Sequence, residues 1–137
     1  MTEASPVLDK LRAISKTSAF NEWLGLEVTA ASDGRAELQI NWRQEFGQYS
    51  GFLHAGIIGA LLDTACGFAA VTMIPAGVLA SHNSVNFFRP AVAARFIVQG
   101  KILKLGKRQT FCAAELHGDA VEDRRRLASG EAILMVG

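Results

Sequence analysis

Cysteine is scarce in this sequence, which contains only two in 137 residues. Cys66 and Cys112 have no metal-type spacing between them, and each lies in a segment expected to be helix or strand. Both are therefore expected to be reduced core thiols. An excess of charge is also absent, because the formal net charge is +1. That balance gives no electrostatic footprint for nucleic acid or for an anionic membrane surface. We expect neither partner, and no bound metal.

Long uninterrupted apolar runs are scarce as well. Residues 1–20 include Asp9, Lys10 and Arg12, so they lack the apolar centre of a signal peptide. The one candidate for a membrane span, Ile57–Met73, contains Asp63 and several small residues, which makes it a poor spanning segment. We therefore expect a soluble, cytoplasmic protein.

Apolar residues are plentiful, at 50% of the chain, which is enough for the core of one domain over residues 1–137. The N-terminal segment, 1–22, has the spacing of a short amphipathic helix over Pro6–Lys16, with Ser5 as the N-cap. Ser18–Leu24 adds one more helical turn.

The remaining residues, 23–137, alternate between strand and helix patterns. Strands are predicted over Leu24–Thr29 and Arg35–Asn41, joined by a turn at Ser32-Asp33-Gly34. A loop and then a long helix over Ala55–Met73 follow, and Pro75 ends that helix. Four further strands are expected at Leu79–Phe88, Ala94–Leu105, Gln109–His117 and Leu127–Val136.

This order predicts an α+β fold, with a six-stranded antiparallel sheet wrapped around one long central helix. The short turns between the last four strands favour a meander of sequential neighbours. The charged run Glu122–Arg126 is expected to be a solvated hairpin tip. Because natural sheet edges are covered or paired, we expect dimerisation through an edge strand.

Asp63 is the one carboxylate in the predicted long helix. A buried carboxylate without a partner is costly or loses its charge. Asp63 therefore needs a hydrogen bond, a neighbouring subunit or a substrate. The residues alone leave two roles open, a catalytic acid and a structural acid that accepts hydrogen bonds.

His54-Ala55-Gly56 opens the same helix, where backbone amides lack partners and the helix dipole is positive. The amide of Ala55 or of Gly56 could stabilise the oxyanion formed from a thioester or ester carbonyl. Asp63 lies about two turns further along, too far to act on that carbonyl from the same helix. Two helices packed antiparallel across a subunit interface would bring Asp63 of one chain to the helix start of the other.

Four blocks of sequence, in this order, resemble the hotdog-fold thioesterases, and among them the phenylacetic-acid-degradation type that hydrolyses acyl-coenzyme A. The blocks are Gln48–Asp63 with its His54-Ala55-Gly56, Leu61-Leu-Asp63-Thr-Ala, Val85-Asn-Phe-Phe-Arg-Pro-Ala91 and Leu105-Gly-Lys-Arg108. The resemblance extends from about Trp23 to Met135. It implies a hotdog fold and a thioester hydrolase whose only coenzyme is the coenzyme A of its substrate. It also implies a homodimer or a dimer of dimers, the latter a homotetramer.

The resemblance implies roles for particular residues. Asp63 matches the nucleophile or general base, and the Ala55 amide matches the oxyanion donor. Gln48 matches a side-chain amide that orients the attacking water or the substrate carbonyl. His-Ala-Gly stands where the family usually has His-Gly-Gly, which adds a methyl group at the carbonyl site.

Further contacts are implied outside the helix. Many relatives carry a hydroxyl where this chain has Ala80, and the adjacent Ser81 is a candidate replacement. The coenzyme A tail is expected near Arg89 and near the turn that contains Lys107 and Arg108, since phosphates favour clustered cations.

Each candidate also has a structural interpretation. The His54 ring can bond to backbone, Gln48 can make turn contacts, and Thr64, beside Asp63, can bond to the carbonyl of residue 60. The acyl group and the choice between direct attack and water activation stay open. A non-catalytic acyl-CoA-binding domain is the main alternative function. A dehydratase or hydratase is less favoured, because it needs a histidine paired with an acid at short spacing.

Overall fold

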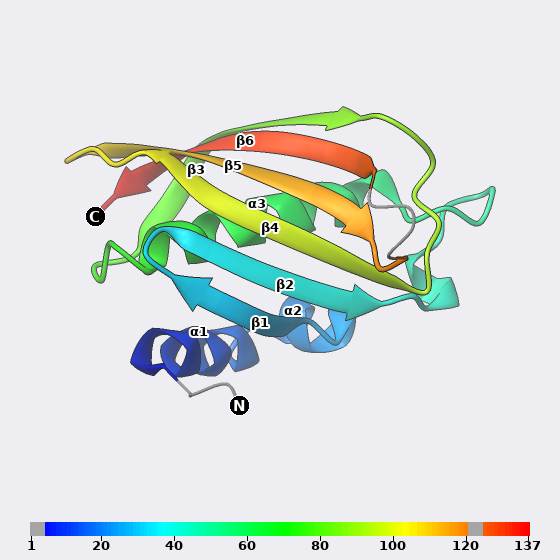
Figure 1. The fold of residues 1–137 in the computed structure, drawn as a ribbon, viewed down its shortest axis with the longest axis horizontal. Coiled ribbons are helices and arrows are strands. Elements are labelled where there is room, and N and C mark those ends of the chain that lie inside the picture. Colours follow the sequence, from blue (N-terminus) through cyan, green and yellow to red (C-terminus); the bar gives the residue numbers. More distant parts are fainter. Residues whose placement is uncertain (1–4, 121–124) are drawn as a thin grey trace.

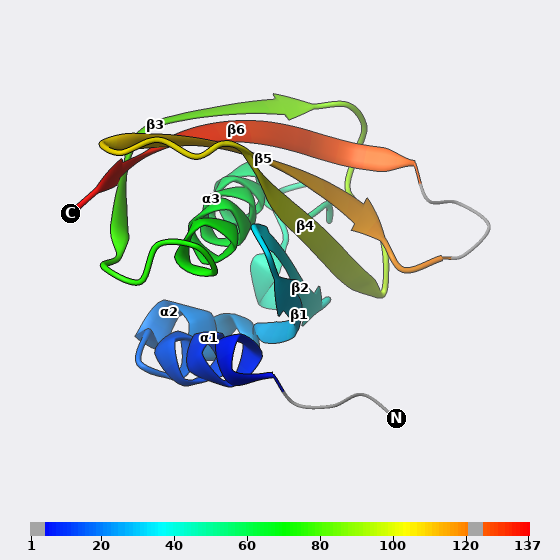
Figure 2. The same cartoon turned by 60° about the vertical axis from the view of Figure 1, so that its left-hand side comes forward.

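The computed structural model describes residues 5–120 and 125–137, and it has a six-stranded antiparallel sheet that curls around one long helix (Figures 1 and 2). The helices are α1 (Pro6–Lys16), α2 (Ala19–Leu24) and α3 (Ala55–Val71), with a short 3₁₀ helix, η1 (Gln44–Phe46). The strands are β1 (Glu27–Ser32), β2 (Arg35–Asn41), β3 (Val78–Phe87), β4 (Arg95–Lys104), β5 (Gln109–Gly118) and β6 (Arg126–Val136).

The N-terminal helices begin at serine caps. Ser5 Oγ accepts a hydrogen bond from the Leu8 amide at 3.1 Å, as the sequence predicts. α1 packs on β1 and so covers that edge of the sheet (Figure 2). α2 ends at Gly25, whose φ of +66° is left-handed. For this reason β1 begins at Glu27, and the predicted strand start at Leu24 is wrong.

α3 lies in the concave face of the sheet. It ends at Val71, two residues before the predicted end, because Thr72 caps it. The Thr72 hydroxyl donates to the Ala69 carbonyl at 2.7 Å and accepts from the Gly34 amide at 2.7 Å, which ties the helix to the β1–β2 turn. Within the described residues, no helix combines the length and the apolar content needed to cross a membrane.

The strand order corrects one prediction. The sheet runs β1-β2-β4-β5-β6-β3, so β3 lies beside β6 at an edge and not beside β4. The meander holds only for β4, β5 and β6. From β3 to β4 the chain must cross three strand spacings, about 14 Å, and the seven residues 88–94 can span about 23 Å. The turn residues between β3 and β4 predicted neighbouring strands, because they do not show that the chain crosses the sheet there.

The β1–β2 hairpin was predicted correctly. Ser32 pairs with Arg35, and the two residues between them, Asp33 and Gly34, have φ of 47° and 83°. Two positive φ angles are typical of a type I′ turn. The other predicted hairpin tip, in Glu122–Arg126, lies mostly outside the described residues, and Arg126 begins β6.

β3 differs from the other edge of the sheet. Eight of its ten residues are exposed, and Val78 and Val85 are partly buried against the core. No described helix covers its free edge, which is available for pairing.

Candidate functional site

A tight loop, residues 47–53, leads into α3 and holds Gln48. Gly47 pairs with Leu53 across the loop, and the Gln48 amide donates to the Phe52 carbonyl at 2.8 Å. Gln48 Oε1 accepts hydrogen bonds from the backbone amides of Ser50 and Phe52. The side-chain oxygen is therefore occupied by turn contacts, and the Nε2 group is the part that can donate to a ligand.

His54 caps α3 through its ring. His54 Nδ1 accepts a hydrogen bond from the Gly56 amide at 2.8 Å, as the structural interpretation of this residue predicted. Because Nδ1 acts as an acceptor here, Nε2 is the ring nitrogen that can act as a donor. A Cβ on Gly56 would lie 3.1 Å from Nδ1, so the cap also requires little bulk at position 56.

The cap selects one backbone amide. The amides of Ile57 and Ile58 both donate to the His54 carbonyl, at 3.0 and 3.1 Å, and that of Gly56 donates to the ring. Within the described chain, the Ala55 amide has no partner. The residues alone left Ala55 and Gly56 both open as oxyanion donors, and the family resemblance favoured Ala55. The structure leaves Ala55 at the positive end of the helix dipole.

Asp63 lies on the side of α3 that faces β3. It is half-buried, and burial raises the pKa of its carboxyl group, while a hydrogen bond with the Asn83 side chain partly opposes that shift. Sequence reasoning missed Asn83. The polar run His82-Asn83-Ser84 shows no alternation, and only the pairing of Asn83 with the buried Ala132 places it on the inner face.

Asp63 and the Ala55 amide do not meet within one chain. Eight residues of helix separate them, about 12 Å at 1.5 Å per residue. The cavity beside Asp63 and Asn83 has a volume of about 10 Å³. A space of that size holds about one water and no acyl group.

The neighbours of Asp63 are occupied by structural bonds. The Thr64 hydroxyl donates to the Ala60 carbonyl at 2.7 Å. Cys66 is buried, and burial raises the pKa of its thiol to about 12. Burial likewise raises the pKa of Cys112, to about 11. Neither thiol is a nucleophile at neutral pH, in line with the prediction of core thiols.

The predicted cluster of cations does not form in one chain. Arg89 follows the end of β3, near the start of β6, because the Phe88 amide donates to the Leu127 carbonyl. Arg108 lies at the other end of β6, since its carbonyl accepts from the Val136 amide. The two ends are about 30 Å apart at 3.3 Å per residue. Within a single chain, Arg89 and Arg108 therefore cannot contact the same phosphate group.

Ser81 occupies a bulge in β3. The register shifts between Ala80 and His82, and the Ser81 hydroxyl donates to the Ile133 carbonyl at 3.2 Å. The hydroxyl is exposed, and its hydrogen is donated to the neighbouring strand, so its oxygen remains able to accept a hydrogen bond.

Comparison with known proteins gives one consistent family. Residues 50–122 match the thioesterase superfamily. A protein of Saccharolobus solfataricus with a provisional esterase name is 31% identical over 103 residues, covering 72% of this chain and 74% of that protein. The crystal structure of a thioesterase family protein from Silicibacter pomeroyi is 32% identical, with a TM-score of 0.89 over 96% of this chain and 99% of that one. PaaI from the phenylacetic acid degradation operon of E. coli, at 17% identity, shares the fold, with a TM-score of 0.87 over 96% of this chain and 93% of that one.

Proposed function

The chain belongs to the thioesterase superfamily and has its hotdog fold, and we propose that it hydrolyses acyl-coenzyme A thioesters in the manner of the phenylacetic-acid-degradation type. The free Ala55 amide at the start of α3 carries this proposal. It is a fixed hydrogen-bond donor in a positive field, which is what the oxyanion of an acyl-transfer reaction requires.

The proposed active site is completed by a second subunit. β3 has a free edge, and antiparallel pairing of two such edges would set the two α3 helices antiparallel across a two-fold axis. Asp63 of one subunit would then approach Ala55 and Gln48 of the other. Each dimer would contain two sites, both at the interface between the subunits. The interface would supply the space for a substrate that the small cavity beside Asp63 lacks in the single chain.

Asp63 could hydrolyse the thioester by either of two routes. In the first, a carboxylate oxygen of Asp63 attacks the thioester carbon, the C–S bond breaks, and coenzyme A leaves as a thiolate that takes a proton from water. Water then hydrolyses the anhydride and restores the carboxylate. In the second, a water molecule adds to the thioester carbon while Asp63 accepts its proton. The C–S bond then breaks, and Asp63 passes the proton to the leaving thiolate. In both, the Ala55 amide donates to the oxyanion.

Gln48 has one role consistent with its contacts. Since Oε1 is held by the loop, Nε2 would donate to the substrate carbonyl or to the oxygen of the attacking water. The methyl group of Ala55 would border the acyl group at this point and limit the bulk that the site accepts.

The same dimer would gather the cations. Antiparallel pairing of β3 brings the Arg89 end of one subunit to the end of the other that carries Lys107 and Arg108. Arg89 Nε is buried without a hydrogen-bond partner within the described chain. We assign these side chains to the phosphates of coenzyme A.

Release of free thiol from a panel of acyl-CoA esters tests this function. The panel should include phenylacetyl, hydroxybenzoyl and straight-chain esters, with wild type, Asp63→Asn, and Asp9→Asn as a matched exposed control. We expect turnover that Asp63→Asn abolishes and Asp9→Asn preserves. Silence across the panel, together with tight binding of an acyl-CoA, would favour a binding domain and make Asp63 structural.

A further inference from the structure

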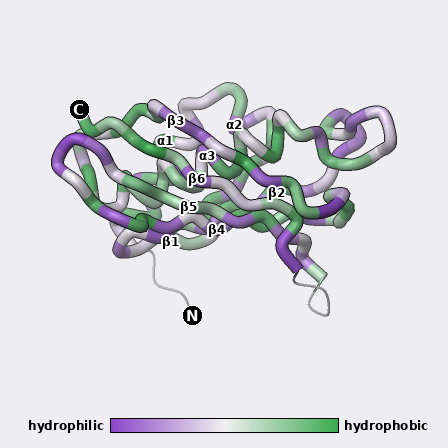
Figure 3. The backbone as a smooth tube through the Cα atoms, turned by 90° about the horizontal axis from the view of Figure 1, so that it is seen from above, coloured by the Kyte–Doolittle hydropathy of each residue, from purple (hydrophilic) through white to green (hydrophobic). Residues whose placement is uncertain are grey.

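α2 carries two aromatic side chains that are half-exposed. Phe20 and Trp23 are 44% and 45% exposed, and their rings stack with centroids 6.1 Å apart. The helix changes from hydrophobic to hydrophilic and back within six residues (Figure 3), and the two aromatic residues are three positions apart, on one side of it. The pair lies outside residues 50–122, which match the family. Adjacent exposed aromatic rings of this kind mark a contact surface.

The Trp23 ring is held in place by its neighbours. Its centroid lies 5.0 Å from that of Phe46, in an edge-to-face arrangement. The Arg43 guanidinium lies over both rings, 5.4 Å from the Trp23 centroid and 4.4 Å from that of Phe46. Arg43 also donates a hydrogen bond to the Trp23 carbonyl. Because the ring is already ordered, a ligand that packs on its exposed part loses little binding energy to further ordering.

The same aromatic group is joined to the start of α3. Phe46 is fully buried, and its carbonyl accepts a hydrogen bond from the His54 amide at 2.9 Å. Ala55, whose amide has no partner within the described chain, is the next residue. One ring contact and one backbone hydrogen bond therefore connect Trp23 to the residue before the proposed oxyanion donor.

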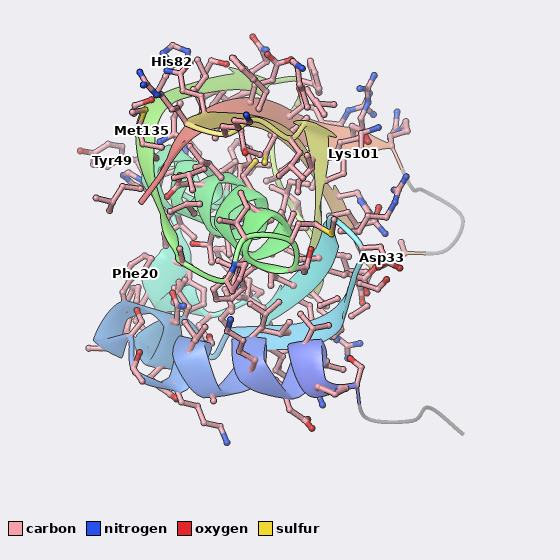
Figure 4. All side chains as sticks on the ribbon, turned by 90° about the vertical axis from the view of Figure 1, so that its left-hand side faces the viewer. Phe20, Asp33, Tyr49, His82, Lys101 and Met135 are labelled. Atoms are coloured by element: carbon pink, nitrogen blue, oxygen red, sulfur yellow. The ribbon has the colours of Figure 1, made fainter. Side chains whose placement is uncertain are left out.

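α2 also faces the side of the molecule on which the proposed active site would form. Figure 4 shows Phe20 and Tyr49 on the same side as β3, whose free edge would pair with the second subunit. Tyr49 follows Gln48 in the loop that leads into α3. The aromatic side chains of α2 and the Gln48 loop therefore border the same side of the chain.

We propose that Trp23, with Phe20 beside it, binds the acyl group of the substrate and makes the protein selective for large apolar acyl groups. Given the proposed thioesterase activity, on which this assignment depends, the thioester carbonyl accepts from the Ala55 amide and the acyl group extends from the same carbon. An aromatic ring or a medium-length alkyl chain buries apolar area against Trp23. An acetyl group has only one methyl group and cannot extend to α2.

The fluorescence of Trp23 tests this contact without turnover. The chain has two tryptophans, so Trp42→Phe leaves Trp23 as the only one, and Asp63→Asn is added to prevent hydrolysis. Phenylacetyl-CoA and decanoyl-CoA should shift the emission of this variant, whereas acetyl-CoA and coenzyme A should leave it unchanged. A shift with one of the two large esters would support the proposal and identify whether a ring or an alkyl chain occupies the surface. Unchanged emission at saturation with both, with binding measured by calorimetry, would overturn it.

Trp23→Ala tests selectivity in a chain that keeps Asp63. For the esters that shift the emission, kcat/KM should fall about tenfold, while kcat/KM for acetyl-CoA should stay within about twofold of wild type. Trp23→Phe keeps a ring and should recover most of the loss. Ile14→Ala, which shortens a similarly exposed residue of α1, should change kcat/KM for neither class of ester. Circular dichroism confirms that each variant is folded.

The selectivity and the activity can fail separately. Thiol release from wild type, together with an equal change for all esters in Trp23→Ala, would overturn the role of Trp23 alone, because the residue would then act only on the stability of the helix start. Absence of both thiol release and binding for every ester would overturn the proposed function and the role of Trp23 with it.

Discussion

At the start of α3, one ring nitrogen decides which backbone amide is left for a ligand. His54 Nδ1 accepts from the Gly56 amide, and the His54 carbonyl accepts from the next two, so that of the amides of residues 55–58 the one of Ala55 has no partner within the described chain. The methyl group that distinguishes His-Ala-Gly from His-Gly-Gly leaves this amide in place. The residue at 56 is the one that geometry constrains, because a side chain there would press on the ring.

His54 is therefore expected to act as a positioning residue. His54→Ala removes the acceptor and should cost about 1 kcal/mol of stability, as other lost N-caps do. We expect kcat to fall more than KM rises, because the oxyanion donor is displaced while the substrate surface is kept. His54→Asn, which retains an N-cap acceptor, should recover much of kcat. Equal activity of all three proteins would contradict this role.

The raised pKa of Asp63 gives a prediction of pH dependence. Above the ordinary value of 3.8, the unfolded chain ionises this carboxyl group more readily than the folded protein does. The contribution of Asp63 to the free energy of unfolding of wild type therefore falls as pH rises from below 3.8 to above the raised pKa of the folded protein. Asp63→Asn should remove this loss and be more stable relative to wild type at pH 7 than at pH 4, as measured by urea unfolding. In wild type, kcat/KM should fall on acidification at a pH above 3.8, since catalysis needs the carboxylate.

At the scale of elements, the contact between α3 and the sheet depends on close backbone approach. A Cβ on Gly100 of β4 would overlap the Ala65 carbonyl of α3, and one on Gly130 of β6 would lie 3.3 Å from the Leu62 side chain of the same helix. These glycines allow α3 to pack close to the concave face of the sheet. This packing sets the position of Asp63 relative to β3.

Gly100→Ala is expected to lower stability by about 1–3 kcal/mol, because backbone must move to admit the methyl group. Gly67→Ala is the matched control. That position is also on α3 and its added Cβ would meet nothing within 4 Å, so it should gain up to about 1 kcal/mol of helix propensity. Thermal unfolding of both variants measures the difference. A Gly100→Ala protein as stable as wild type would show that α3 is not tightly packed against β4 at this position.

At the scale of the whole molecule, function is expected to require two chains. The single chain keeps Ala55 and Asp63 about 12 Å apart along α3 and puts Arg89 and Arg108 at opposite ends of the sheet. The proposed antiparallel pairing of the exposed β3 would bring both sets together.

Mixing two inactive variants tests the shared site. Gln48→Ala and Asp63→Asn each damage a different half of it, so a mixed dimer has one intact site and one with both defects. After unfolding and refolding an equal mixture, random pairing about a two-fold axis should restore about a quarter of wild-type activity. The separately refolded variants are the control. A mixture no more active than these controls would place Gln48 and Asp63 of each site in the same chain.

Local chemistry in the sequence determined the elements. The Ser5 cap, the Asp33-Gly34 turn and the apolar run of α3 each act over a few residues, so periodicity and turn preferences were enough to predict them. Asp63 became a candidate for the same reason, as the one acid in an apolar helix.

Tertiary structure decided what depends on distant residues. The place of β3 beside β6 follows from packing over a crossing of seven residues, which no turn motif encodes. Asn83 reached Asp63 only through that placement. The choice of Ala55 as the free amide needed the hydrogen bonds of its neighbours, and the separation of Arg89 from Arg108 needed the strand order. Sequence spacing reports neighbours along the chain, whereas a site is made by neighbours in space.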